Sequence, residues 1–316
     1  METTARRKIL LPVDGSDQAL EVVRYISAMV NPQKTMVVLF YVGSGFPEVF
    51  WNLDSNPLYR TKKNDVMEWL ADRQLAIGEF KEKALRIMDR AGFKTSEISI
   101  KTQTTKTVVL KDIIQESYQD YSAIAVGRSG LSRLKDLLIG SMAYKLIAKI
   151  KHIPTIVIGG QPTSRKIMIA LDESIEAMRG VSAIAALAAN SRDSVITICH
   201  CLCAADVSQF YGRSTVTKEE EAEGRRYLQD KFSPYMDEAT RRLKEAGVDP
   251  SNISRQFLFT RRSPLQKVIE VATAEQVGTM VVGRRDYAGF MDEHFRGRFS
   301  ERLISSINNI AVWVSG

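Results

Sequence analysis

The stretch RKILLPVDGS at residues 7–16 is repeated in similar form as RKIMIALDES at residues 165–174. In both copies two basic residues precede an apolar run, the run ends at an aspartate, and a serine follows two positions later. A short apolar run that stops at a polar turn is typical of a buried strand. Its recurrence indicates that one structural module is written twice in this chain.

A second match and the chain length support this duplication. AVGR at residues 125–128 returns as VVGR at residues 281–284, and 316 residues exceed the usual size of one compact core. Between the copies, GGQPTS at residues 159–164 has the composition of a linker. We therefore expect one domain over residues 1–160 and a second over residues 165–316.

Within each copy, apolar runs alternate with segments of helical periodicity. Such alternation predicts an α/β fold, with a parallel sheet covered by helices on both faces, in two tandem Rossmann-like domains. In the first copy the expected strands are 9–13, 36–42, 98–103, 123–126 and 153–158, and the expected helices are 17–30, 66–91, 108–118 and 141–150. In the second copy the expected strands are 166–171, 195–201, 253–259, 279–282 and 310–314.

The first copy carries residues suited to binding a phosphate. Open parallel sheets bind ligands at the carboxyl ends of their strands. Asp14 follows the first expected strand, and Gly127 and Gly130 follow the fourth. Glycines let a backbone approach a ligand closely, and the helix that Gly140-Ser141 opens would attract an anion to its N-terminus. This spacing predicts a phosphate site in the first domain.

The spacing Gly-x2-Gly-x9-Gly-Ser over residues 127–141 resembles the ATP-binding signature of the universal stress protein family, and VDGS at residues 13–16 resembles its opening motif. The resemblance covers nearly the whole chain, as two tandem domains. It implies a five-stranded parallel sheet of order 3-2-1-4-5 in each domain. It also implies ATP, with or without Mg²⁺, bound largely by backbone amides. The nucleotide-binding residues would be Pro12, Val13, Asp14, Val42, Gly127, Arg128, Gly130, Gly140, Ser141 and Met142.

The second copy departs from this signature. Asp286 stands at the position of Gly130, Glu173 at that of Gly15, and the last pair reads Gly297-Arg298. Each added carboxylate would repel a polyphosphate by about 1 kcal/mol or more. We therefore expect the second site to be degenerate for ATP.

Three cysteines lie close together at Cys199, Cys201 and Cys203, with His200 between them. On a strand, His200 would point to the opposite face from the cysteines, so the four side chains cannot converge on one metal ion. Buried cysteines on a core strand are the preferred interpretation, and no metal-binding residue is expected. A zinc site that pairs two of these cysteines with the distant His294 is the alternative.

The segment at residues 43–65 is long for a connection between a strand and a helix, and it carries several aromatic residues. Two interpretations stay open, a lid over the nucleotide and a segment that packs on the neighbouring domain.

The charge and the missing motifs exclude several functions. The net charge is +7, but acidic and basic residues interleave, and no nucleic-acid-binding signature appears. No apolar run is long enough to span a bilayer, and the N-terminal one is too short for a signal peptide. We expect a cytoplasmic protein without a nucleic-acid or membrane partner.

No P-loop or nucleophile elbow is present, and no catalytic residue is expected. The expected function is that of an ATP-binding regulator of the stress response, not an enzyme. The resemblance further implies a homodimer, or pairing of the two domains within one chain, through the last strands; other protein partners stay unknown. The alternatives are a nucleotide-free dimerising scaffold and a slow ATPase.

Overall fold

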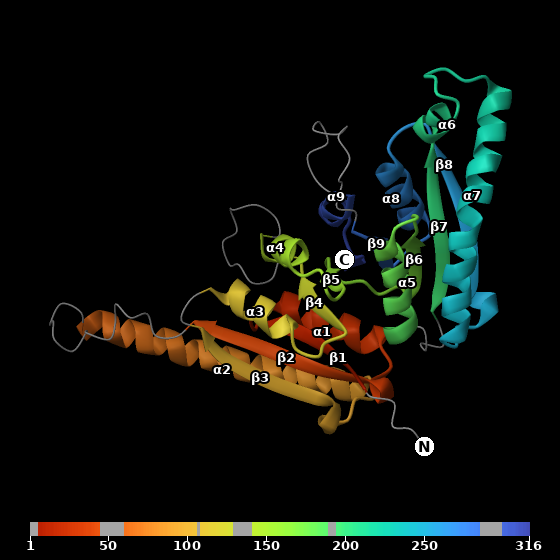
Figure 1. The fold of residues 1–316 in the computed structure, drawn as a ribbon. Helices are drawn as coiled ribbons and strands as arrows, with labels where there is room; N and C mark the ends of the chain where they lie inside the picture. Colours follow the sequence, from red (N-terminus) through yellow and green to blue (C-terminus); the bar gives the residue numbers. More distant parts are fainter. Residues whose placement is uncertain (1–5, 45–59, 106–107, 129–140, 189–193, 285–298) are drawn as a thin grey trace. The chain divides into compact units, whose positions relative to one another are not determined.

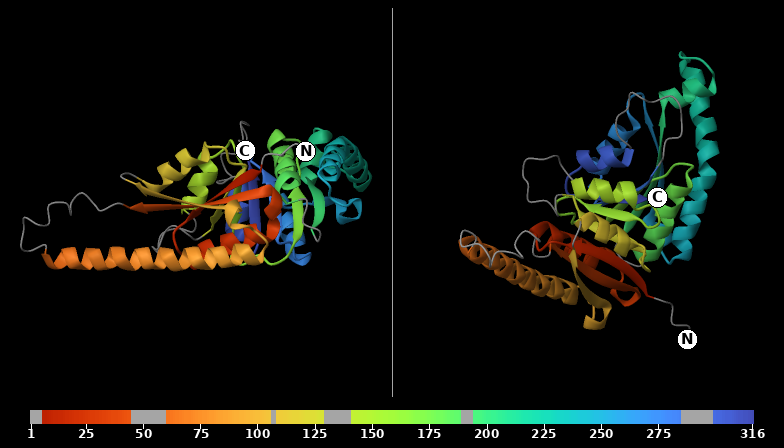
Figure 2. Two further views of the ribbon diagram at one scale, coloured as in Figure 1. Left: turned by 90° about the horizontal axis from the view of Figure 1, so that it is seen from below. Right: turned by 60° about the vertical axis from the view of Figure 1, so that its left-hand side comes forward.

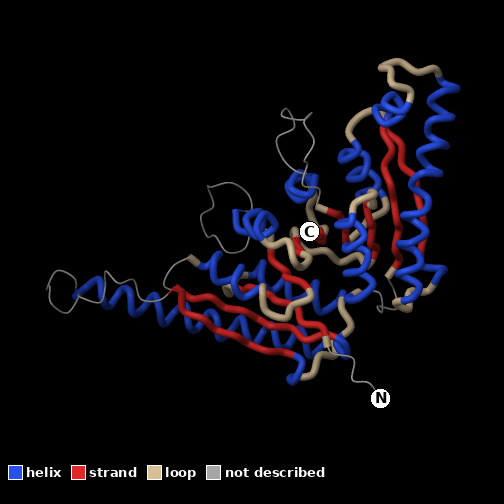
Figure 3. The backbone as a smooth tube through the Cα atoms, in the orientation of Figure 1, coloured by secondary structure: helices blue, strands red, loops and turns tan. Residues whose placement is uncertain are grey.

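The computed structural model describes residues 6–44, 60–105, 108–128, 141–188, 194–284 and 299–316 (Figure 1). The chain forms two compact units. The first comprises Met1–Ala28 and Pro32–Lys149, and the second comprises Met29–Asn31 and Ile150–Gly316. In both units the described part consists of a sheet and helices (Figure 3).

The first unit contains a four-stranded parallel sheet of order β3-β2-β1-β4. Its strands are β1 (Arg7–Val13), β2 (Thr35–Ser44), β3 (Ile98–Thr105) and β4 (Ala123–Gly127). Its helices are α1 (Asp17–Met29), α2 (Arg60–Arg90), α3 (Val109–Ser117) and α4 (Ser141–Lys149), with the short 3₁₀ turns η1 (Pro32–Lys34) and η5 (Thr95–Glu97). Consecutive residues Ile9, Leu10 and Leu11 of β1 are fully buried, so both faces of this central strand are covered.

The second unit contains a six-stranded sheet of order β5-β10-β9-β6-β7-β8. Its strands are β5 (Thr155–Ile158), β6 (Lys166–Ala170), β7 (Val195–Cys203), β8 (Ile253–Thr260), β9 (Thr279–Gly283) and β10 (Ala311–Ser315). Its helices are α5 (Ile175–Leu187), α6 (Ala204–Phe210), α7 (Lys218–Glu245), α8 (Pro264–Ala274) and α9 (Phe299–Ser306), with the 3₁₀ turn η6 (Pro250–Asn252). In both Figure 1 and Figure 2, α7 runs alongside β7 and β8. The five strands of the second copy, β6 to β10, thus have the expected order 3-2-1-4-5, and the expected α/β fold is confirmed.

Strand β5 comes from the first sequence copy but lies in the second unit. It pairs antiparallel with β10, in the register Val157 to Val312 and Ile156 to Trp313. Ile156 and Trp313 are fully buried, and Trp313 is the largest such side chain described in the chain. The last strands of the two copies therefore share one apolar ladder.

The observed elements differ from the expected ones mainly at their ends. Helix α2 begins at Arg60, six residues before its expected start. Its first six residues, RTKKND, include Arg and Lys, which favour helix, but they are polar and show no apolar periodicity. The periodicity in the sequence therefore did not indicate this first part of the helix. Strand β5 begins at Thr155 and not at residue 153, since Pro154 has no N–H to donate to a ladder. Helix α6 was not expected. Residues 45–59, most of the segment with two open interpretations, lie outside the described residues.

Among the helices that the structure describes, we find none with the length and apolar character needed to cross a membrane.

Candidate functional site

Three strand ends meet at the carboxyl edge of the first sheet. In the ladders, Val13 of β1 is level with Tyr41 of β2, and Leu10 of β1 is level with Ile124 of β4. Continued in register, these ladders bring Asp14 level with Val42 on one side and with Arg128 on the other. The fold thus places expected residues from three separate parts of the sequence at one edge, where open parallel sheets bind ligands.

The side chains at this edge limit what each residue can offer a ligand. Val13 and Val42 are only 5% and 6% exposed, and Pro12 is also buried. A ligand at the edge can therefore reach these residues mainly through their backbone atoms. Arg128 is half-buried.

A hydrogen-bonded turn connects β1 to α1 and fixes Asp14. The Ser16 N–H donates to Asp14 Oδ1 at 3.0 Å, and Ser16 Oγ accepts the Ala19 N–H at 3.2 Å. Gly15 between them has a φ of +83°, which explains a glycine at this position. The turn orients the Asp14 carboxylate at the sheet edge and caps the first turn of α1.

Helix α1 touches the end of β4. A Cβ placed on Gly127 would lie 2.5 Å from Cγ of Gln18, so only glycine fits without moving that side chain. Gln18 was not among the expected site residues. Its place beside Gly127 results from the packing of α1 on β4, and no feature of its local sequence indicates this contact.

The phosphate end of the site is described only in part. Helix α4 begins at Ser141, as expected, and Met142 in its first turn is half-buried. Gly130 and Gly140 lie outside the described residues. Of the predicted site, the structure therefore describes the residues at the strand ends and the start of α4.

The equivalent corner of the second unit has the same two hydrogen bonds, but a different part of the chain packs against it. The Ser174 N–H donates to Asp172 Oδ1 at 2.9 Å, and Ser174 Oγ accepts the Ala177 N–H at 3.1 Å. A Cβ on Gly283 would lie 2.5 Å from the backbone N of Ala177, so helix backbone closes this corner. Glu173 pairs with Lys231 of α7 at 3.8 Å.

The arginines at matching positions of the two copies also differ in burial. Arg284, which matches Arg128 in the repeat, is only 4% exposed, and its backbone N–H donates to the Ser315 carbonyl at 2.8 Å. Because Arg284 is buried, its side chain is less accessible to a ligand than that of the half-buried Arg128. Asp286, Gly297 and Arg298 lie outside the described residues.

His200 and the cysteines lie on opposite faces of β7, as expected. The His200 ring stacks on Phe232 of α7 at 3.7 Å, and its Nδ1 lies 2.7 Å from the Leu171 carbonyl oxygen. Burial raises the pKa of the Cys199 and Cys201 thiols to about 12. In the described ranges, no group of three or more His, Cys, Asp or Glu residues could hold a metal ion. His294, which the zinc alternative needs, lies outside those ranges.

The chain matches the family model described as "Universal stress protein family" twice, over residues 5–158 and 163–314. Together the two matches cover nearly the whole chain. None of the curated proteins compared with the chain matches it.

Two solved structures resemble the chain over its length. A universal stress protein from Archaeoglobus fulgidus DSM 4304 has a TM-score of 0.52 and 16% identity, over 98% of this chain and 97% of that one. A putative universal stress protein from Pseudomonas aeruginosa UCBPP-PA14 has a TM-score of 0.53 and 14% identity, over 98% of this chain and 93% of that one. At these identities, the likeness to the solved structures is one of fold.

Proposed function

Because the chain belongs to the universal stress protein family, we propose that it is a regulator of the stress response that binds ATP in its first repeat. In this proposal the protein is not an enzyme. Bound ATP shifts the protein between conformations or assembly states, and the second repeat takes no ATP.

One observation carries the proposal. Asp14 directly follows β1, Val42 lies near the end of β2 and Arg128 directly follows β4, so all three belong to the carboxyl edge of adjacent parallel strands. This edge offers an acceptor for a base or a sugar hydroxyl, backbone groups for a base edge, and a cation for a phosphate. In this proposal Val42 faces the base, Asp14 faces the sugar or the base, and Arg128 faces the phosphates.

The remaining expected residues would hold the phosphates. Gly127 and Gly130 let the backbone approach them, and Gly140, Ser141 and Met142 would offer the N–H groups that open α4. The described residues fit this role, because α4 starts at Ser141 and its first N–H groups have no partner within the helix. When bound, Mg²⁺ would neutralise part of the phosphate charge.

The contrast between the two repeats supports ATP in the first repeat alone. The first corner is closed by the side chain of Gln18, which can rotate, and the second by the backbone of α5, which cannot. Glu173 also brings a carboxylate to the second turn, where the first has Gly15.

The β5–β10 ladder supports pairing of the last strands within one chain. Because β5 pairs with one edge of β10 and β9 pairs with the other, β10 has no edge left for a second chain. A homodimer in the proposal therefore uses another surface.

The test is calorimetric titration of ATP, with and without Mg²⁺, into the protein and two variants. Gly130→Asp copies the residue of the second repeat, and Gly78→Asp makes the same change where an added side chain meets open space. We expect the wild type and Gly78→Asp to bind equally, and Gly130→Asp to lose binding with an unchanged circular dichroism spectrum. Equal binding by Gly130→Asp would refute the site. Steady formation of ADP would instead favour the slow ATPase.

A further inference from the structure

A groove lies in the second unit, between α7 and β8. From α7 it is lined by Asp237, Thr240, Arg241 and Lys244, and from the segment that opens β8 by Pro250, Ile253 and Arg255, with a volume of about 430 Å³. The α7 residues recur at the spacing that places them on one helix face. The groove lies at the amino end of β8, whereas nucleotides in such sheets bind at the carboxyl ends.

Strand β8 is the last strand of the sheet in this unit. Among the described strands it pairs only with β7, in parallel, from Ile253 to Thr260. An edge strand leaves alternate N–H and C=O groups without ladder partners, and these can pair with an added strand. Ile253 and Arg255 lie two residues apart, so both side chains point into the groove beside this edge.

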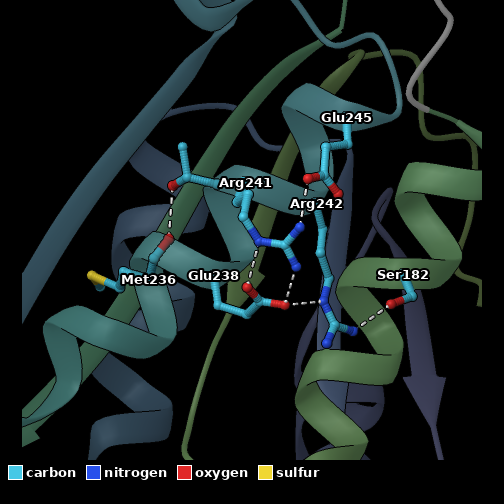
Figure 4. Close-up of polar contacts among 7 residues, drawn as sticks. Ser182, Met236, Glu238, Arg241, Arg242 and Glu245 are labelled. Atoms are coloured by element: carbon cyan, nitrogen blue, oxygen red, sulfur yellow. Dashed lines mark hydrogen bonds and ion pairs between the residues drawn. The ribbon is translucent and has the colours of Figure 1, made fainter.

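An ion-pair network fixes the arginines of the groove. Arg255 pairs with Asp237. Arg241 donates from Nε and Nη2 to the two carboxylate oxygens of Glu238, each at 2.8 Å, and from Nη1 to Glu245 (Figure 4). Because both of these carboxylates lie on α7, Arg241 is held along the surface of that helix, where it forms part of the groove wall.

Glu238 is itself held in place. Arg242 donates to it at 2.7 Å and also donates to Ser182 Oγ of α5 at 2.8 Å (Figure 4). Hydrogen bonds from Arg241 and Arg242 lower the pKa of Glu238 to about 2, so it stays ionised at neutral pH.

Lys244 differs from the arginines. Its ammonium has no carboxylate partner among the residues that the structure describes, whereas Arg241 and Arg255 have partners. The groove therefore combines two apolar lining residues, Pro250 and Ile253, with the Lys244 ammonium and the outer edge of β8. An acidic group is the complement of that cation.

We propose that this groove and the edge of β8 bind an extended acidic peptide segment of a partner protein. The segment adds to β8 as a further strand, packs an apolar side chain on Ile253 and Pro250, and sets a carboxylate against Lys244. Main-chain hydrogen bonds supply affinity in this mode, and alternate side chains supply specificity.

The probe is the fluorescein-labelled, blocked peptide Thr-Val-Thr-Glu-Thr-Val-Thr, which presents Val, Glu and Val on one face of a strand. Its matched control has Lys in place of Glu. Anisotropy is measured with the whole protein, with Lys244→Glu, and with Lys218→Glu, which makes the same charge change on α7 outside the groove. We expect the Glu peptide to bind about tenfold more tightly than the Lys peptide. Lys244→Glu should reverse the preference, and Lys218→Glu should leave it unchanged.

Hydrogen exchange gives the second readout. Bound Glu peptide should slow the exchange of backbone amides over residues 253–260. Equal affinity for the two peptides, unchanged preference in Lys244→Glu, or unaltered exchange in β8 would each overturn the proposal. So would acetate displacing the peptide at equal concentration, which would indicate a small-anion site, or a peptide-independent dimer that Lys244→Glu abolishes, which would indicate a second copy of the chain.

Discussion

Gln18 lies so close to Gly127 that a Cβ on the glycine would be 2.5 Å from Gln18 Cγ. A Cβ on Gly283, the matching glycine of the second repeat, would lie at the same distance from the backbone N of Ala177. The same strand end is therefore closed by a movable side chain in one repeat and by fixed backbone in the other.

This difference predicts unequal costs for the same substitution. Gly283→Ala should destabilise its unit by about 1–3 kcal/mol, because backbone must shift to admit the methyl group. Gly127→Ala should cost about 1 kcal/mol or less, because Gln18 can change rotamer. Urea titrations followed by hydrogen exchange in peptides from each repeat measure both. Equal costs, or a larger cost for Gly127→Ala, would contradict the packing described here.

A capping box begins helix α7. Thr217 Oγ1 accepts the Glu220 N–H at 3.2 Å, and the Glu220 carboxylate accepts the Thr217 N–H at 2.8 Å. Thr217→Ala should lower the free energy of unfolding of the second unit by about 1 kcal/mol. Thr215→Ala, an exposed position just before the helix, is the control and should change it by less than about 0.5 kcal/mol. The cap would have no such role if both variants lost the same stability.

The buried thiols predict a loss of stability at high pH. Burial raises the pKa of Cys199 from 9.0 to about 12 in the folded protein. Between these values the unfolded chain loses the thiol proton and the folded chain keeps it, so stability falls as the pH rises, by up to about 1.4 kcal/mol for each pH unit. Below that range the thiol is protonated in both states and contributes no pH dependence.

Comparing the wild type with Cys199→Ala isolates this effect. The variant should lose stability less steeply above the ordinary thiol pKa, whatever its stability at neutral pH. The native protein should also react slowly with a disulfide reagent near neutral pH and quickly once unfolded. Parallel stability curves for the two proteins would show that Cys199 does not titrate as described.

Much of this fold could be predicted from the sequence, because buried parallel strands are nearly continuous apolar runs. The run before Asp14 and its repeat before Asp172 indicate both β1 and β6. The placement of Asp14 and Gly127 at one edge of the sheet also follows from sequence, since each lies at the carboxyl end of a strand of one parallel sheet. The polar start of α2 at Arg60 could not be predicted, because it carries no apolar periodicity.

Contacts that depend on how the elements pack could not be predicted from the sequence. Gln18 beside Gly127, and Ala177 beside Gly283, result from how closely α1 and α5 approach the sheet, which side-chain volumes across the whole unit decide. The groove at Lys244 was missed for the same reason, since α7 and β8 meet there only in the folded chain. The antiparallel β5–β10 pairing was indicated by family resemblance and not by any pattern in those two strands.

If the first repeat alone holds ATP, the nucleotide content of the purified protein will show it. The protein is denatured, and the released nucleotide is identified and quantified by chromatography. We expect one ATP per chain, from an occupied first repeat and an empty second one. Release of no nucleotide, together with no binding when Mg-ATP is added, would contradict it and leave a nucleotide-free scaffold as the function.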